Sequence, residues 1–305
     1  MRRRSLLALP FLGPASRARA QPAPLRVVAS FSILGYMLRE VGGARIALRV
    51  LAGPDVDAHG FQPRPSHAEA LRGAQLVLRN GLGFESWFDR LLRSAGGAPR
   101  IVTVTDGLAI RPAGQRAPGE APRPGSPAPD PHAWQDLRLG QGYARAIGAA
   151  LAAADPPGAA EYAARTTAYV ARLGTLDGWV REQIGRVPSE RRKVVTTHDS
   201  FGYFADAYGV TFLAAQGVSP ESEPSAAAVA RLVRLIRAEG ITAVFQENAG
   251  NPATLRRITA EAGVTLRGRL YADALSAPGG PAATYEAMFR HNVGLLVPAM
   301  LGAPT

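Results

Sequence analysis

The sequence predicts an α/β protein built from two pseudo-symmetric lobes, each with a mostly parallel four-stranded sheet, which are joined by a long backbone helix. Strand-like and helix-like segments alternate along most of the chain, the pattern of an α/β fold. One long helical pattern divides this alternation into two halves. The 305 residues, 47% of them hydrophobic, suffice for two domains with their own cores. We expect a first lobe at residues 21–157, a linking helix at 158–187 and a second lobe at 188–305.

The first twenty residues have the composition of an export signal. Three arginines follow Met1, residues 6–12 form a short apolar stretch, and Ala18-Arg19-Ala20 places small residues where a signal peptidase reads them. The apolar stretch is too short to cross a bilayer as a helix. The tandem arginines are compatible both with the general secretory (Sec) pathway and with twin-arginine export, so the sequence does not decide between these two export pathways. The alternative is a basic N-terminal segment without fixed structure.

Charge and cysteine content narrow the choice of partners and compartment. Residues 1–20 hold five arginines and no acids, so the formal net charge falls from +11 to +6 without them. The remaining arginines are scattered and form no cluster interleaved with aromatic residues, which argues against a nucleic-acid partner. The chain has no cysteine, hence no disulfides and no thiol for lipoprotein acylation. We therefore expect a soluble, monomeric periplasmic protein that is not a lipoprotein.

In the first lobe, apolar runs alternate with segments of helical spacing. Ser66, with Glu69 three residues later, predicts a capping box at a helix start. Residues 111–130 are rich in Pro, Gly and Ala without an apolar period, which predicts a mobile surface loop. A further helix is expected around Tyr143 and is broken by Asp155-Pro156-Pro157. The other expected elements are strands at 26–29, 46–51, 76–78 and 101–104 and helices at 32–41, 66–73 and 84–92.

The linking helix is predicted by apolar and aromatic residues that recur at intervals of four and three. No proline interrupts the segment, and Gly174 and Gly178 weaken it only modestly. A helix over residues 158–186 would be about 40 Å long and could act as a rigid connection between the lobes. Two ordinary consecutive helices are the alternative. The recurring positions are Tyr162, Thr166, Tyr169, Leu173, Leu176, Val180 and Ile184.

The second half repeats the alternation of strands and helices, which is why we expect two similar lobes. Its expected strands are at residues 193–197, 210–214, 243–246 and 265–270, and its expected helices are at 201–208, 225–238, 252–262 and 284–297.

Four side chains able to bind a cation stand at strand ends or in turns. His59 lies in a turn, His132 ends the Pro-rich loop, and His198 and Asp273 each follow an apolar strand-like run. Open α/β sheets bind ligands beyond the carboxyl ends of their strands, so we expect these four to meet in a cleft between the lobes. Three neutral imidazoles and one carboxylate form a closed tetrahedral set that suits zinc.

Each of these residues also has an ordinary structural interpretation. His59 could be a surface turn residue, His132 part of a helix cap, His198 a hydrogen-bonded core histidine, and Asp273 the cap of a helix. The other two of the five histidines are not expected to bind metal. His67 should face solvent from a helix, and His291 should stabilise the last helix.

Three acids could orient the imidazoles by accepting a hydrogen bond from the ring nitrogen that does not bind metal. They are Asp57, Asp199 and Glu247. Ordinary turn and surface roles are an equally good interpretation of each, and none is expected to be a ligand.

Seven segments form an ordered set of motifs along the chain. They are GPDVDAHGFQPRPS (53–66), NGLGFESW (80–87), DPHAW (130–134), THDSFGYF (197–204), GVSPESEPS (217–225), FQEN (245–248) and LYADALS (270–276). In these segments the chain resembles the periplasmic solute-binding proteins that feed zinc and manganese ABC transporters, the cluster A-I metal-binding family. The resemblance covers residues 27–296 and implies two pseudo-symmetric lobes, a long backbone helix and metal ligands at His59, His132, His198 and Asp273.

The resemblance implies high-affinity capture of zinc and its delivery to an ABC permease in the inner membrane, with a periplasmic metallochaperone as a further partner. Manganese, or both ions, is the alternative cargo. Residues 111–129 contain no histidine, so the metal-gathering role of the His-rich loop in many zinc relatives is not expected. His198 stands where manganese relatives typically have a carboxylate, and imidazole suits zinc better than manganese.

Two other classes of protein remain as rivals. A periplasmic zinc hydrolase would keep one metal position open for water and carry a general base. The chain has no His-Glu-x-x-His, and Asp273 would fill the open position. His198-Asp199-Ser200 cannot form a catalytic triad because the three residues are adjacent, and no Gly-x-Ser-x-Gly occurs. We therefore expect no enzyme. The second rival is an adhesin or structural surface protein, whose deletion should cause no loss of fitness in metal-poor medium, whereas deletion of a transporter component should.

Overall fold

The structure is a computed structural model and describes residues 23–114, 128–217, 225–248 and 252–303. The expected export signal at residues 1–20 lies outside the described residues, as do residues 115–127 of the Pro-rich loop and residues 218–224 of one motif. No helix in the described ranges is long and apolar enough to cross a membrane.

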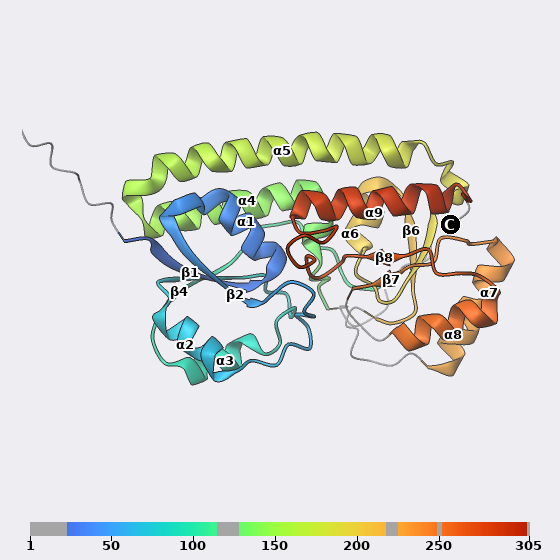
Figure 1. The fold of residues 1–305 in the computed structure, drawn as a ribbon, viewed down its shortest axis with the longest axis horizontal. Helices are drawn as coiled ribbons and strands as arrows, with labels where there is room; N and C mark the ends of the chain where they lie inside the picture. Colours follow the sequence, from blue (N-terminus) through green and yellow to red (C-terminus); the bar gives the residue numbers. More distant parts are fainter. Residues whose placement is uncertain (1–22, 115–127, 218–224, 249–251, 304–305) are drawn as a thin grey trace, which may run out of the picture.

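The first lobe contains the expected four-stranded parallel sheet, in the order β2-β1-β3-β4. Helices α2 and α3 cover one face of the sheet, and α1 lies on the other face beside the long linking helix (Figure 1). The elements are β1 (Leu25–Phe31), α1 (Ser32–Gly42), β2 (Ile46–Ala52), α2 (Pro65–Gly73), β3 (Leu76–Arg79), α3 (Phe88–Ala95) and β4 (Arg100–Thr103).

Two helix starts in this lobe differ from expectation. Helix α2 begins at Pro65, and the Nδ1 of His67 accepts the backbone N–H of Arg64 at 2.8 Å. The predicted Ser66–Glu69 capping box is therefore wrong, because Ser66 already lies inside the helix. Helix α3 begins at Phe88 instead of residue 84. Residues 81–83 all have positive φ, and residues 82–87 form turns that precede the helix.

The predicted linking helix is one continuous α-helix, α5 (Ala159–Gly185), of 27 residues. It follows α4 (Leu137–Ala154) and packs against α1 and α4 in the first lobe and against α6 and α9 in the second. Figure 1 shows it extending along both lobes. The recurring apolar positions explain this, because they form one buried stripe that faces both lobes. Its buried members are Tyr162, Tyr169, Leu173, Leu176, Val180 and Ile184.

The second lobe has parallel strands, but they do not form one regular four-stranded sheet. Within the described residues, β5 pairs with β6 and β7 with β8, and one parallel bridge joins Val195 to Val244. Strand β8 is shorter than predicted because Gly268, with φ +138°, interrupts the run at 265–270. The elements are β5 (Lys193–Thr196), α6 (Gly202–Tyr208), β6 (Thr211–Ala214), α7 (Ala226–Glu239), β7 (Gln246–Glu247), α8 (Pro252–Ala262), β8 (Arg269–Leu270) and α9 (Tyr285–Met300).

The largest hydrophobic core is shared between the lobes. Phe31 and Trp134 from the first lobe belong to the same buried cluster as Phe204 and Tyr285 from the second. The Trp134 indole also donates to the carbonyl of Ala272, 2.8 Å away. Packing of this kind holds the facing strand ends of the two lobes in fixed positions, and the candidate site lies there.

Candidate metal centre

The structure brings the four predicted ligands together at the contact between the lobes. His59 lies in the turn region after β2, His132 directly precedes the short 3-10 turn before α4, His198 follows β5 and Asp273 follows β8. His59 is 7% exposed, and the other three are fully buried. One nitrogen or oxygen from each residue lies within 4.8 Å of the atoms from the other three.

The Nε2 atoms of the three imidazoles surround the Asp273 carboxylate. The Nε2 of His59 lies 3.3 Å from that of His132 and 3.5 Å from Asp273 Oδ2. The Nε2 of His132 lies 3.5 Å from Asp273 Oδ1, and that of His198 lies 3.0 Å from Oδ2. Four atoms bound tetrahedrally at zinc's usual bond lengths would stand about 3.3 Å apart. The spacing therefore fits an ion with little rearrangement.

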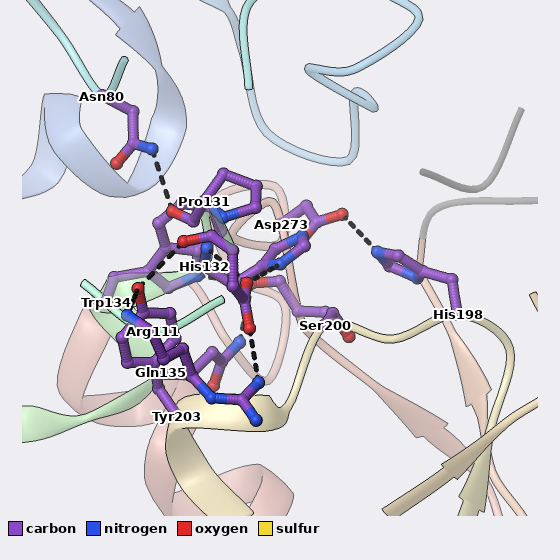
Figure 2. A network of polar contacts seen from close by, with 12 residues as sticks. Asn80, Arg111, Pro131, His132, Trp134, Gln135, His198, Ser200, Tyr203 and Asp273 are labelled. Carbon is purple, nitrogen blue, oxygen red and sulfur yellow. Dashed lines mark hydrogen bonds and ion pairs between the residues drawn. The ribbon is translucent and has the colours of Figure 1, made fainter. Parts of the chain in front are cut away.

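The Asp273 carboxylate lacks ordinary partners. Both of its oxygens are buried, and neither accepts a hydrogen bond within the described part of the chain. Its 3.0 Å contact with His198 (dashed in Figure 2) does not have hydrogen-bond geometry. A buried carboxylate without hydrogen bonds is costly unless a charge compensates it. A protonated His198 supplies that charge when no metal is bound, and a cation bound between Asp273 and the imidazoles would supply it in its place.

Glu247 holds His198 from the side that faces away from Asp273. Its Oε2 lies 2.8 Å from the Nδ1 of His198, and its Oε1 accepts the backbone N–H of the same residue at 2.9 Å. The Ser200 hydroxyl donates to Oε2 at 2.8 Å. Glu247 therefore makes the imidazole contact that the sequence had left open.

The other two acids considered from the sequence do not contact an imidazole. The Asp57 carboxylate accepts the backbone N–H of His59 at 2.8 Å, which stabilises the turn instead of the ring. Asp199 follows His198 and donates its backbone N–H to the carbonyl of Gly217. The Nδ1 atoms of His132 and His198 contact Asp130 and Glu247 instead.

The sequence interpretation missed Asp130. Its Oδ1 lies 2.8 Å from the Nδ1 of His132 and accepts the backbone N–H of that residue at 3.0 Å. Its Oδ2 accepts from Arg111 at 2.7 Å. Asp130 was assigned to the surface loop, although the spacing Asp-Pro-His is a signal for such a contact, because Asp side chains commonly bond the backbone two residues on.

Burial and neighbouring charges set the protonation of the site. Burial lowers the pKa of His59 to about 3, so its ring is neutral and free to bind a cation at Nε2. For Asp273, burial acts to raise the pKa, but His198 and His132 outweigh it and lower the pKa below its usual value. Burial acts to lower the pKa of His198, yet Glu247 and Asp273 raise it well above the ordinary range.

The remaining histidines lie outside this cluster. His67 is partly exposed and accepts the backbone N–H of Arg64, as described above. His291 lies with its Nε2 2.9 Å from the carbonyl oxygen of Arg269. His67 therefore takes part in the start of α2 instead of simply facing solvent, whereas His291 has a structural contact, as the sequence predicts.

Four buried nitrogen and oxygen donors that could hold a cation thus lie between two α/β lobes joined by a long helix, an arrangement that suits a protein which binds a metal ion. The family described as "ZnuA: Zinc-uptake complex component A periplasmic" matches residues 27–299. The chain belongs to this family of substrate-binding components of metal ABC transporters.

Individual relatives are similar over nearly their full length. The manganese-binding lipoprotein MntA of Halalkalibacterium halodurans is 30% identical over 90% of this chain and 87% of its own. The zinc-binding protein TroA of Treponema pallidum is 32% identical over 93% of this chain and 91% of its own. The solved structure of this periplasmic zinc-binding protein has a TM-score of 0.82 at 29% identity and covers 92% of this chain and all of its own. A manganese-bound periplasmic metal-binding protein from Candidatus Liberibacter asiaticus has a TM-score of 0.79 at 26% identity, covering 90% and 98%. The relatives' metals therefore differ.

Proposed function

We propose that the protein captures zinc with His59, His132, His198 and Asp273 and delivers it to an ABC-type importer. The observation that carries the proposal is the meeting of three imidazole Nε2 atoms and a carboxylate without hydrogen bonds in one buried cluster. The sequence segments that supply these atoms are far apart, so their convergence is a property of the fold. Family membership supports delivery to an ABC transporter.

Zinc is preferred to manganese because three of the four ligands are imidazoles, while manganese is better matched by oxygen. Manganese, alone or with zinc, is the second candidate, and one observation favours it. Oδ1 of Asp273 faces His132, whereas Oδ2 faces His59 and His198. A carboxylate that binds through both oxygens would give five ligand atoms, and the larger coordination number suits manganese better than tetrahedral zinc.

Catalysis is not part of the proposal. A catalytic zinc keeps a position for water, whereas four protein ligands complete a tetrahedral sphere. The cluster is also almost completely buried, and the rings of Phe84 and Trp134 lie 4.6 Å and 5.3 Å from those of His59 and His132. Such a site is better suited to holding an ion than to admitting an organic substrate.

The proposed compartment is the periplasm, with a permease in the inner membrane as the partner that receives the ion. A periplasmic metallochaperone is a second proposed partner, and nucleic acid is not one. The chain has no cysteine to carry a lipid, so we propose a soluble monomer, in contrast to MntA, which is named a lipoprotein. Fractionation of cells into periplasm and membrane, with the protein followed by immunoblot, tests the location.

Elemental analysis of protein purified from the periplasm, followed by competitive titration of the metal-free protein with zinc and manganese, tests the cargo. Zinc should bind with the higher affinity. His132→Ala should weaken zinc binding by more than about a hundredfold, because losing a residue that binds the ion directly should cost more than losing one that only contacts such a ligand. His291→Ala is the matched control, because that ring lies outside the cluster. Unchanged zinc affinity in His132→Ala would rule out the proposed ligand set.

A further inference from the structure

Arg111 lies behind the imidazole of His132, on the far side of Asp130. Its Nη1 donates to Asp130 Oδ2 at 2.7 Å, while the other carboxylate oxygen of Asp130 contacts the ring of His132. The Asp130 side chain is 1% exposed and that of Arg111 is 21% exposed. Arg111 therefore supplies the positive charge that a buried Asp130 needs.

The two ends of the Pro-rich loop meet at this ion pair. The backbone N–H of Asp130 donates to the carbonyl of Arg111 at 3.0 Å, and Pro112 forms an antiparallel bridge with Pro129. We call residues 111–114 and 128–130 the loop base. Because its two strands are paired, the position of Arg111 and the position of Asp130 are linked.

Helix α6 of the second lobe holds the loop base on both sides. The Tyr203 hydroxyl accepts the backbone N–H of Arg111 at 3.2 Å and donates to the carbonyl of Asp130 at 2.9 Å. Asp206 accepts from the Nε of Arg111 at 2.9 Å, but its side chain is 67% exposed, so solvent screens this second ion pair. Figure 2 shows Arg111 and Tyr203 together beneath His132.

Gly202, the first residue of α6, leaves the space that Arg111 occupies. A Cβ at this position would overlap the Nη1 of Arg111 and would lie 2.7 Å from Asp130 Oδ2. Gly202 starts a helix and does not have a positive φ. The requirement for glycine is thus the close approach of Arg111 and not the backbone conformation.

We propose that Arg111 is a positioning residue for His132, held against α6 in the space left by Gly202. The inference rests on the proposed metal site and deepens it. An ionised Asp130 can only accept hydrogen bonds, so the Nδ1 of His132 carries the proton and Nε2 presents its lone pair to the ion. Arg111 fixes the carboxylate that selects this tautomer. The orientation of a ligand from the first lobe consequently depends on a helix of the second lobe.

The first experiment compares Arg111→Ala and Arg111→Lys with Arg45→Ala. Arg45 is a matched control because it forms a 2.7 Å ion pair with Asp155, is 24% exposed and has no contact with the site. In equilibrium competition Arg111→Ala should bind zinc about tenfold more weakly, and in stopped-flow chelation it should release zinc correspondingly faster. A loss of this size is at the lower end of the range for residues that contact a metal ligand and not the ion itself. Arg111→Lys should recover part of the loss, because one ammonium can still reach Asp130. Arg45→Ala should bind as the wild type does.

A second variant tests the geometry without removing the charge. Gly202→Ala should displace Arg111 and reproduce the loss of zinc affinity seen in Arg111→Ala. Ring nitrogen NMR of the metal-free proteins should show the Nδ1–H tautomer of His132 in the wild type and in Arg45→Ala. The same spectra should show a population with the proton on Nε2 in Arg111→Ala and Gly202→Ala.

These readouts separate failure of the inference from failure of the proposed function. If wild-type protein does not bind zinc, the proposed function fails, while the tautomer measurement still tests Arg111. Wild-type zinc affinity in both Arg111→Ala and Gly202→Ala would overturn the inference. So would an equal loss of affinity in Arg45→Ala, because the effect would then reflect general stability.

Discussion

Glu247 binds His198 at two points: its Oε2 lies 2.8 Å from the ring Nδ1, and its Oε1 accepts the backbone N–H of the same residue at 2.9 Å. Both the position of the residue and the rotation of its ring are thus set by one carboxylate. Because the 2.8 Å contact places a negative charge beside Nδ1, it favours a ring proton on Nδ1, and Nε2 then faces Asp273 unprotonated when the ring is neutral.

Glu247→Gln is expected to weaken zinc binding by about 10- to 100-fold. The glutamine oxygen can accept the backbone N–H of His198, but its amide would then donate to Nδ1 and favour a proton on Nε2, where the ion must bind. Competition with a chelator of known affinity measures the loss. Glu239→Gln, which removes the carboxylate of a part-exposed ion pair with Lys193, is the control. Equal affinities for the wild type and Glu247→Gln would contradict the prediction.

Zinc binding is expected to release a proton from His198 and none from His59. Glu247 and Asp273 overcome the effect of burial and raise the pKa of His198 well above its usual value, so the ring carries a proton at neutral pH that zinc must displace. The pKa of His59, lowered to about 3 by burial, leaves that ring neutral throughout this range. Affinity should therefore fall about tenfold for each unit of pH below neutral.

Calorimetry of zinc binding in buffers of different ionisation enthalpy counts the protons released. The observed binding enthalpy should change with the buffer in the wild type and change less in Glu247→Gln, where one of the two carboxylates is gone. A binding enthalpy independent of the buffer would show that no proton leaves.

Asp55→Ala is expected to lower the free energy of unfolding by about 1–2 kcal/mol. Asp55 has φ +55°, and its Oδ2 accepts the backbone N–H of Ala277 at 2.9 Å, just beyond the segment that carries Asp273. Alanine loses this acceptor and tolerates the left-handed backbone poorly. Asp55→Asn keeps an acceptor and suits that conformation, so its loss should be under about 0.5 kcal/mol. Urea unfolding measures both; equal stability of Asp55→Ala and wild type would refute the contact's contribution.

Two glycine-to-alanine changes, one in α5 and one in α4, should have opposite effects on the stability of the protein. A Cβ at Gly178, inside α5, would meet no atom within 4 Å, so Gly178→Ala should stabilise the protein by about 0.5–1 kcal/mol. A Cβ at Gly148 in α4 would overlap Thr166 Oγ1, so Gly148→Ala should destabilise by about 1–3 kcal/mol. Thermal unfolding of the metal-free proteins gives both values. Destabilisation by Gly178→Ala would indicate a contact on that face.

The architecture could be predicted where one local pattern decides the structure. The α5 stripe is an example, since residues such as Leu173 and Val180 recur with the helical period and are buried. The second-lobe sheet could not be predicted in the same way. Apolar residues at 265–270 look like a strand, whereas the backbone of Gly268, at φ +138°, ends the regular pairing there. Composition does not reveal that conformation.

Some residues of the candidate site are likewise revealed by a local sequence pattern, and others are not. His198 and Asp273 could be singled out because each follows an apolar strand, and strand ends of parallel sheets gather at one edge. Asp130 was missed because it was assigned to the Pro-rich loop, and the sequence does not reveal that Arg111, 19 residues away across the base of that loop, pairs with it. Glu247 remained ambiguous for a similar reason, since only the pairing of separate strands places it beside His198.

The continuous helix α5 has a consequence for how an ion can enter and leave. A connection made of 27 helical residues, buried against both lobes, contains no loop about which one lobe could swing widely away from the other. We therefore expect exchange through displacement of single turns while the lobes stay packed. Among the four proposed ligands only His59 is partly exposed, so we expect the ion to enter and leave on the side of the molecule where His59 lies.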